Sequence, residues 1–149
     1  MKIAEIETIP IRLPTRRVHQ WASLTTPIGV YVIIKLHTDA GLVGLGEAPV
    51  LKDWGGDHGK YFGETPQTTV HIIKDILGPA LKGEDPCRFE QIHGIMDKAV
   101  KGYPYAKAAI DMALYDVAGK AMQVPAYQFL GGCFRDRISI AHSLGLMEI

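Results

Sequence analysis

With 149 residues, of which 16 are basic and 16 acidic, the chain has the size of one domain and no net charge to attract nucleic acid or a membrane surface. Hydrophobic residues make up 47% of it and charged residues 21%, which is typical of a globular protein. No run of about 18 apolar residues predicts a membrane span, and the widely separated Cys87 and Cys133 form no CxxC spacing, so we expect a cytoplasmic protein without disulfides, nucleic-acid partner or membrane partner.

Three segments in the first third of the chain have the patterns of β-strands. Residues 2–14 alternate between apolar and polar side chains, and Pro10 within them removes a ladder donor, which predicts an edge position or a bulge. Residues 28–37 are rich in β-branched and aromatic side chains. A tight turn then leads into residues 42–48, so the three strands are predicted to form an antiparallel meander.

Two long loops, residues 15–27 and 49–64, connect these elements. Both contain aromatic side chains, which are unexpected in a plain linker. The second loop also holds two aspartates and a histidine, Asp53, Asp57 and His58, which are metal-ligand types. Loop carboxylates are usually solvated, however, and three such residues without a recognised spacing do not predict a metal site.

Two helices are predicted next. Thr65 offers a hydroxyl N-cap and Pro66 suits the first helical position, so a helix is expected to run to Leu77, where Gly78-Pro79 would end it. Asp85-Pro86 repeats the start signal for a helix that reaches about residue 100.

The segment 106–132 has the strongest helical pattern. Its apolar face combines small and larger residues at spacings of three and four, namely Ala106, Ala109, Ile110, Ala113, Leu114 and Val117. The small residues predict that a neighbouring element approaches closely. Lys107/Asp111 and Asp116/Lys120 have the i,i+4 spacing of helical ion pairs. The helix should end before Pro125, and a short helical turn at 126–130 should stop at Gly131-Gly132.

Motifs for chemistry are weak. Gly41, Gly44 and Gly46 have the reverse of the spacing of a dinucleotide-binding loop and lie in a hairpin, which favours turn and strand glycines. Glu47 and Asp116 are the carboxylates with the best claim to face an active site. The alternative, which the spacing favours, is that Glu47 bonds to loop backbone and that Asp116 pairs with Lys120 or caps a neighbouring turn.

The order of elements predicts the fold class. Three strands are followed by three or four helices and then by a lone strand at 138–146. Strands followed by helices indicate an α+β fold, here a three-stranded antiparallel meander followed by a helical bundle on one face of the sheet.

A family resemblance enters at the segment 106–132. It is similar to the signature of the mandelate racemase/muconate lactonizing enzyme family of the enolase superfamily. The matching residues are Ala109, Asp111, Ala113, Leu114, Asp116, Gly119, Lys120, Pro125, Leu130, Gly131 and Gly132. The resemblance implies an N-terminal capping domain over residues 1–132, then a linker and the first strand of an incomplete (β/α) barrel, a TIM barrel, over residues 133–149. A whole barrel needs about 250 residues.

The resemblance also implies a function for the complete enzyme. It would be a Mg²⁺-dependent racemase, cycloisomerase or dehydratase, that is, an isomerase or lyase that abstracts the proton α to the carboxylate of a small substrate. We expect it to be a homo-oligomer. No residue of this chain matches the family's catalytic or metal-binding motifs, so the chain alone is expected to be inactive and to bind no Mg²⁺.

In such an enzyme the two long loops would form a lid over the barrel mouth. By position and residue type, the expected substrate contacts in the loops are Val18, His19, Trp21, Trp54 and Tyr61. Ser143, near the end of the first barrel strand, is the sixth. An alternative from another class stays open: a stand-alone α+β module for binding or oligomerisation, without catalysis.

Overall fold

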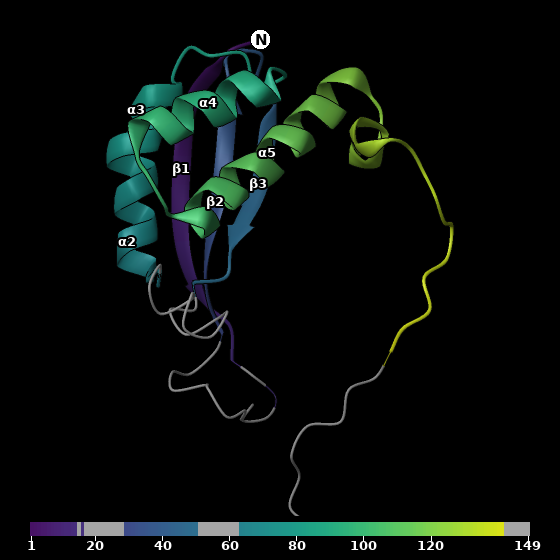
Figure 1. Cartoon of the computed structure of the whole chain (residues 1–149), viewed down its shortest axis with the longest axis horizontal. Helices are drawn as coiled ribbons and strands as arrows, with labels where there is room; N and C mark the ends of the chain where they lie inside the picture. The colour runs from purple at the N-terminus through teal and green to yellow at the C-terminus, as the bar shows by residue number, and fades with distance from the viewer. Residues whose placement is uncertain (15, 17–28, 51–62, 142–149) are drawn as a thin grey trace, which may run out of the picture.

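The computed structural model describes residues 1–14, 16, 29–50 and 63–141. Three strands, β1 (Ile3–Arg12), β2 (Val30–Thr38) and β3 (Val43–Ala48), form one antiparallel sheet in the order β1-β2-β3 (Figure 1). Each strand pairs with the one that precedes or follows it in the chain. The predicted meander is therefore confirmed.

The two faces of the sheet differ in burial. Along β2, Val32, Ile34 and Leu36 are fully buried, whereas the residues between them are half-buried. This alternation is that of a strand with one face in the core. The buried face lies against the helices, and Glu47 of β3 is exposed on the opposite face. Figure 1 shows two of these helices, α4 and α5, in front of the strands.

Pro10 lies in β1, at the edge of the sheet and opposite Val32. The predicted edge position is confirmed. The irregularity in the register of β1 lies at the other end of the strand, between Ile3 and Glu5. An edge strand tolerates proline because half of its N–H groups point away from the sheet.

The first helical segment is longer than the sequence suggests. α2 (Pro66–His71), the π-helical segment η1 (Ile72–Leu77) and α3 (Gly78–Leu81) follow one another directly. The predicted end at Gly78-Pro79 is therefore wrong. The Gly78 N–H donates to the Ile73 carbonyl, five residues earlier. This wider turn shifts the hydrogen-bond register just before Pro79, which then occupies the first turn of α3, where a missing donor costs nothing.

α4 (Phe89–Ala99) begins later than predicted. The Asp85 carboxylate accepts the Cys87 N–H over 3.1 Å, and the Asp85 carbonyl accepts the Arg88 N–H, also over 3.1 Å. Asp85-Pro86 therefore makes a turn before the helix and not its N-cap, because the aspartate side chain closes an Asx turn on its own backbone. The predicted end near residue 100 is confirmed, with Val100 as the C-cap.

α5 (Pro104–Met122) is the longest helix and packs against β3 and β2. A Cβ atom added to Gly44 or Gly46 would overlap the carbonyl oxygen of Ala113 or Ala109, respectively. The glycines of β3 therefore let the helix backbone lie directly on the strand. This confirms the close approach predicted from the small residues, and it confirms that these glycines are structural.

The ion pairs of α5 were predicted only in part. Asp116 and Lys120 pair at 2.6 Å, as their i,i+4 spacing predicts. Lys107 and Asp111 do not pair with each other. Lys107 Nζ lies 2.7 Å from Asp97 Oδ1, and Asp111 Oδ1 lies 2.6 Å from His93 Nε2. The prediction for that pair is wrong because α4 packs beside α5 and offers a closer partner to each charge.

α5 ends where the sequence predicts, and a short 3₁₀ segment, η2 (Ala126–Leu130), follows Pro125. The core between sheet and helices contains as its largest fully buried side chains Ile3, Ile34, Leu36, Ile73, Leu77, Leu81, Ile92, Ile110 and Leu114. No helix in the described part of the chain is long and apolar enough to cross a membrane.

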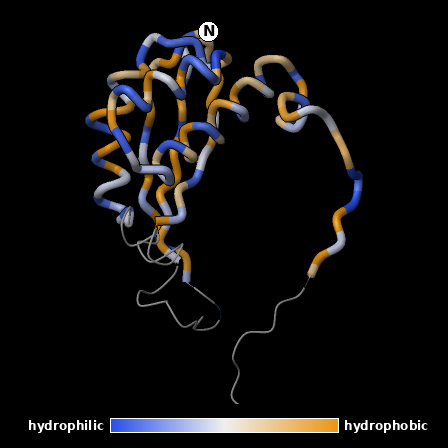
Figure 2. The backbone as a smooth tube through the Cα atoms, in the orientation of Figure 1, coloured by the Kyte–Doolittle hydropathy of each residue, from blue (hydrophilic) through white to orange (hydrophobic). Residues whose placement is uncertain are grey.

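Beyond η2 the chain leaves the domain (Figures 1 and 2). Of the strand predicted at 138–146, the structure describes residues 138–141, and these form no strand. Ile138 and Ile140 are 79% and 95% exposed. Residues 138–141 form no strand because none of the described strands lies beside them to share backbone hydrogen bonds.

Candidate functional site

The sheet brings the ends of the two long loops to one place. At the end of β1, Arg12 lies opposite Val30, and at the end of β3, Ala48 lies opposite Val32. The residues that lead into and out of both loops therefore share one end of the sheet (Figure 1). We call this the loop-bearing end; the sequence predicted the two loops but not that their ends meet.

The first loop is closed by backbone pairing. The Leu13 N–H donates to the Gly29 carbonyl over 2.7 Å, directly after β1 and directly before β2. This bond continues the β1–β2 ladder for one more step. It holds both ends of the first loop together at the loop-bearing end of the sheet.

The second loop is closed by a buried carboxylate. Glu64 Oε1 accepts the Tyr105 N–H over 2.6 Å, and Oε2 accepts the Ala106 N–H over 3.0 Å. The Thr69 hydroxyl donates to the same Oε2 over 3.2 Å. The first turn of a helix has N–H groups without a partner inside the helix, and its dipole favours a negative charge there. Glu64 therefore ties the exit of the second loop to the start of α5.

Burial raises the pKa of the Glu64 carboxyl, while the hydrogen bonds from Tyr105, Ala106 and Thr69 oppose that rise. The side chain is fully buried, and it is one of the few buried polar groups in the described residues. All three of its partners belong to α2 and α5. The chemistry of this group is therefore that of an anchor between elements.

This anchor could not be predicted from the sequence. Glu64 precedes the Thr65 cap, and nothing in its surroundings indicates a second helix as its partner. Tyr105 and Ala106 are 41 and 42 residues further along the chain. Glutamate is usually a surface residue, also just before a capping box. Only the packing of α5 shows that Glu64 is buried and bonded to that helix.

The six expected substrate contacts lie outside the described residues. They are Val18, His19, Trp21, Trp54, Tyr61 and Ser143. Asp53, Asp57 and His58 also lie outside them. The structure describes where the loops are anchored, and the contacts of these side chains stay predictions.

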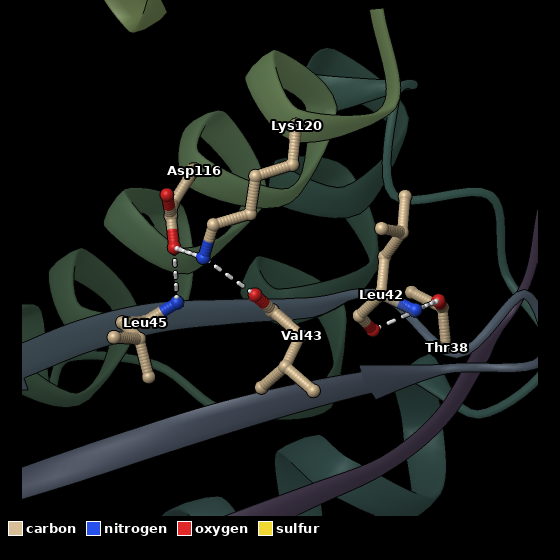
Figure 3. Close-up of polar contacts among 6 residues, drawn as sticks. All are labelled: Thr38, Leu42, Val43, Leu45, Asp116 and Lys120. Atoms are coloured by element: carbon tan, nitrogen blue, oxygen red, sulfur yellow. Dashed lines mark hydrogen bonds and ion pairs between the residues drawn. The ribbon is translucent and has the colours of Figure 1, made fainter. Parts of the chain in front are cut away.

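Asp116 binds the edge of β3. Its Oδ2 accepts the Leu45 N–H over 2.8 Å and lies 2.6 Å from Lys120 Nζ, which donates to the Val43 carbonyl over 2.8 Å (Figure 3). The structural interpretation of Asp116 is confirmed: it pairs with Lys120 and satisfies the backbone of a neighbouring element. Glu47 is exposed on the sheet face that points away from α5.

The described residues do not fit a metal site. Within residues 1–14, 16, 29–50 and 63–141, no group of three or more His, Cys, Asp or Glu side chains could hold an ion. Mg²⁺ needs several oxygen ligands in near-octahedral geometry. This part of the chain therefore offers a scaffold for two loops and no metal centre.

Comparison with known proteins decides the family. The model of the mandelate racemase/muconate lactonizing enzyme N-terminal domain matches residues 4–131. The chain belongs to this family. Its fold is that of an enolase-superfamily N-terminal domain, because solved structures of that superfamily superpose on nearly the whole chain. The α+β fold class and the resemblance stated from the sequence are both confirmed.

Among curated relatives of this family member, the N-succinyl-L-Arg/Lys racemase of Bacillus cereus is 37% identical over 99% of this chain and 38% of its own length. A chloromuconate cycloisomerase of Cupriavidus pinatubonensis is 37% identical over 93% of this chain and 36% of its own. The chain thus spans about 38% of the length of such relatives.

A solved structure of the dipeptide epimerase of Enterococcus faecalis, in complex with Mg and the dipeptide L-Leu-L-Tyr, has a TM-score of 0.87 at 32% identity. It covers 99% of this chain and 39% of the epimerase. These three proteins are thus a racemase, a cycloisomerase and an epimerase, and this chain matches only part of each.

Proposed function

We propose that this chain forms the N-terminal capping domain of an enolase-superfamily enzyme, a racemase, cycloisomerase or dehydratase that acts on a small carboxylate. The observation that carries the proposal is the family match over residues 4–131, in which both long loops end at the loop-bearing end of the sheet. Residues 1–132 would be the capping domain, and residues 133–149 a linker and the first barrel strand.

The role of this chain would be to cover and select the substrate. Leu13–Gly29 pairing and the Glu64 anchor hold the ends of the two loops in place. The loops between them would close over the substrate, exclude water and contact its side chain through residues such as Trp21 and Trp54. Rigid anchors suit that task, because a lid on fixed ends positions its side chains reproducibly.

The chemistry would lie elsewhere in the complete protein. When bound, Mg²⁺ would stabilise the negative charge that develops on the carboxylate of the substrate. The described residues of this chain fit no such ion, so the metal ligands and the acid/base groups would come from a barrel. The chain alone would then be inactive, and the complete protein would be a cytoplasmic homo-oligomer.

The test compares the 149-residue chain with the protein encoded when the gene is read beyond codon 149. The assay follows exchange of the α-proton for deuterium, with and without Mg²⁺, on N-succinyl amino acids and dipeptides, and lactonisation on muconates. We expect activity only in a longer protein, and Trp21→Ala or Trp54→Ala should change KM and substrate preference more than the fold.

Two results would overturn the proposal. A stop codon directly after residue 149 would favour the stand-alone binding or oligomerisation module. Metal-dependent proton exchange by the 149-residue chain itself would show that the chemistry lies within it.

A further inference from the structure

The alternation of backbone hydrogen bonds between β2 and β3 determines which backbone groups of β3 lie on the open edge of the sheet. The Thr38 N–H donates to the Leu42 carbonyl over 3.0 Å, so these two residues form a hydrogen-bonded pair. In an antiparallel ladder such pairs alternate with positions whose backbone groups point away from the partner strand. In the β2–β3 register, the N–H and C=O groups of Val43, Leu45 and Glu47 therefore face away from β2. In the described sheet, they form its open edge on β3.

Two of these groups are occupied by side chains from α5. The Leu45 N–H donates to Asp116, and Lys120 donates to the Val43 carbonyl. Figure 3 shows both side chains reaching from the helix to the strand, with the Asp116–Lys120 ion pair between them. The clamp, by which we mean Asp116 and Lys120 together, thus supplies one acceptor and one donor, which are what an added strand would supply.

The other edge of the sheet, on β1, is closed by different means. The Ile3 N–H donates to the Glu84 carbonyl over 2.9 Å, and the Gly83 N–H donates to the Ile3 carbonyl over 2.8 Å. Further along, Pro10 lies opposite Val32. By the same alternation, the backbone groups of Val32 bond to β3 and not to β1. The backbone nitrogen of Pro10 therefore points away from β2, where a missing N–H leaves no donor for another strand.

We propose that the clamp keeps β3 from pairing with β3 of a second copy of this chain. A free edge is a template for another strand, and proteins protect it with charged side chains, prolines or covering elements. A second copy is the partner that this edge fits, because antiparallel edges pair symmetrically about a two-fold axis. Leu45, which is 50% exposed, would add apolar contact to such a pair. The proposal does not depend on the proposed function.

The geometry explains why these two residues perform this task. They lie one helical turn apart on α5, and Gly44 and Gly46 allow α5 to lie directly on β3. From that distance a short aspartate reaches one edge group and a longer lysine reaches the next. Charged partners make the stronger hydrogen bonds, so an incoming strand would have to displace a favourable contact to gain an ordinary one.

The test uses the full chain with both clamp residues replaced, Asp116→Ala and Lys120→Met, so that neither side chain can bond to the edge of β3. Hydrogen exchange at the Val43, Leu45 and Glu47 amides is measured at low and high protein concentration, alongside the mass in solution by light scattering. At low concentration we expect the Leu45 amide of the variant to exchange about tenfold faster than in the parent chain, as for the loss of one hydrogen bond to a charged group. At high concentration its mass should rise and all three of these amides should become protected.

Two further variants make the result specific. Asp111→Asn alters a side-chain contact between α5 and His93 of α4 without touching the strand edge, so it should leave the mass and the β3 amides as in the parent chain. Leu45→Pro, added to the double variant, removes an N–H that β2 does not use and should restore the mass of the parent. If that proline variant does not fold, Leu45→Lys blocks the same edge with a charge and serves instead.

The proposal fails if the double variant exchanges fast at Leu45 and keeps the mass of the parent chain at every concentration. It also fails if the variant associates while the β3 amides stay unprotected, because association would then use another surface. A rise in mass that Asp111→Asn shares would likewise overturn it, since general destabilisation would explain it.

Discussion

Glu64 and Ala106 are 42 residues apart in the sequence, and the Glu64 Oε2 atom lies 3.0 Å from the Ala106 amide nitrogen. This bond joins the end of the second long loop to the start of the longest helix. The position of Glu64, at the exit of the loop, therefore depends on the packing of α5. The exit of the loop is thus held by a bond to a helix that packs in the core.

Replacement of Glu64 by glutamine is expected to lower the free energy of unfolding by about 1–3 kcal/mol. The substitution replaces one carboxylate oxygen by an NH2 group, and this donor would then lie against a backbone N–H, which is also a donor. Urea unfolding of the two chains measures the difference. Glu5→Gln, at an exposed position of β1, is the matched control and should change stability by less than about 0.5 kcal/mol. Equal stability of the Glu64→Gln chain and its parent would contradict the anchor.

Gly46→Ala should destabilise the chain by about 1–3 kcal/mol, since its Cβ would overlap the Ala109 carbonyl and force the helix away from the strand. Gly94→Ala is the control and should stabilise the chain. Gly94 lies in α4, where a Cβ would meet open space, and alanine is the better helix former by about 0.8–1.0 kcal/mol. Thermal unfolding of the two variants beside the parent chain measures both changes. A neutral Gly46→Ala would show that the close approach of α5 to β3 is not required.

The Lys107 ammonium beside Asp97 holds the pKa of that carboxyl below its usual value. In acid, the unfolded chain therefore takes up this proton at a higher pH than the folded chain does. The stabilisation due to the pair is present above the unfolded pKa of about 3.9 and is lost as pH falls through the lower folded value.

The measurement for this pair is the stability of the parent chain minus that of Asp97→Asn, followed from neutral pH into acid. The difference should be constant near neutrality and shrink in acid. High salt should reduce it, because the Asp97 side chain is 65% exposed. A difference that grows as pH falls would have the wrong sign for this ion pair.

The apolar side chains beyond η2 should make the chain bind hydrophobic dyes and self-associate. Phe134, Ile138 and Ile140 are 89%, 79% and 95% exposed, and exposed apolar surface of this kind promotes association. Replacement of all three by serine should lower both dye fluorescence and the mass in solution, with unfolding of the domain unchanged. Unaltered dye binding would place the apolar surface elsewhere.

Local patterns were sufficient for most of the secondary structure. Thr65 caps α2 as predicted, with a reciprocal bond to Thr68, and Pro10 lies at an edge. The cap depends on a neighbour three residues away in the sequence. The edge position depends on the N–H that proline lacks in any surroundings. The alternation of the strands and the family signature at 106–132 belong to the same class, because each is a pattern of residues that are close in the sequence.

Tertiary structure decided the rest. Lys107 and Asp111 have the spacing of a pair, yet each binds a residue of α4, since packing brings other hydrogen-bonding partners closer. Gly78-Pro79 did not end a helix, because a π-turn accommodates the proline. Glu64 and the clamp of Asp116 and Lys120 satisfy backbone groups of elements that are distant in the chain. Sequence thus determines which hydrogen-bonding groups and apolar faces exist, and only packing decides which distant groups meet.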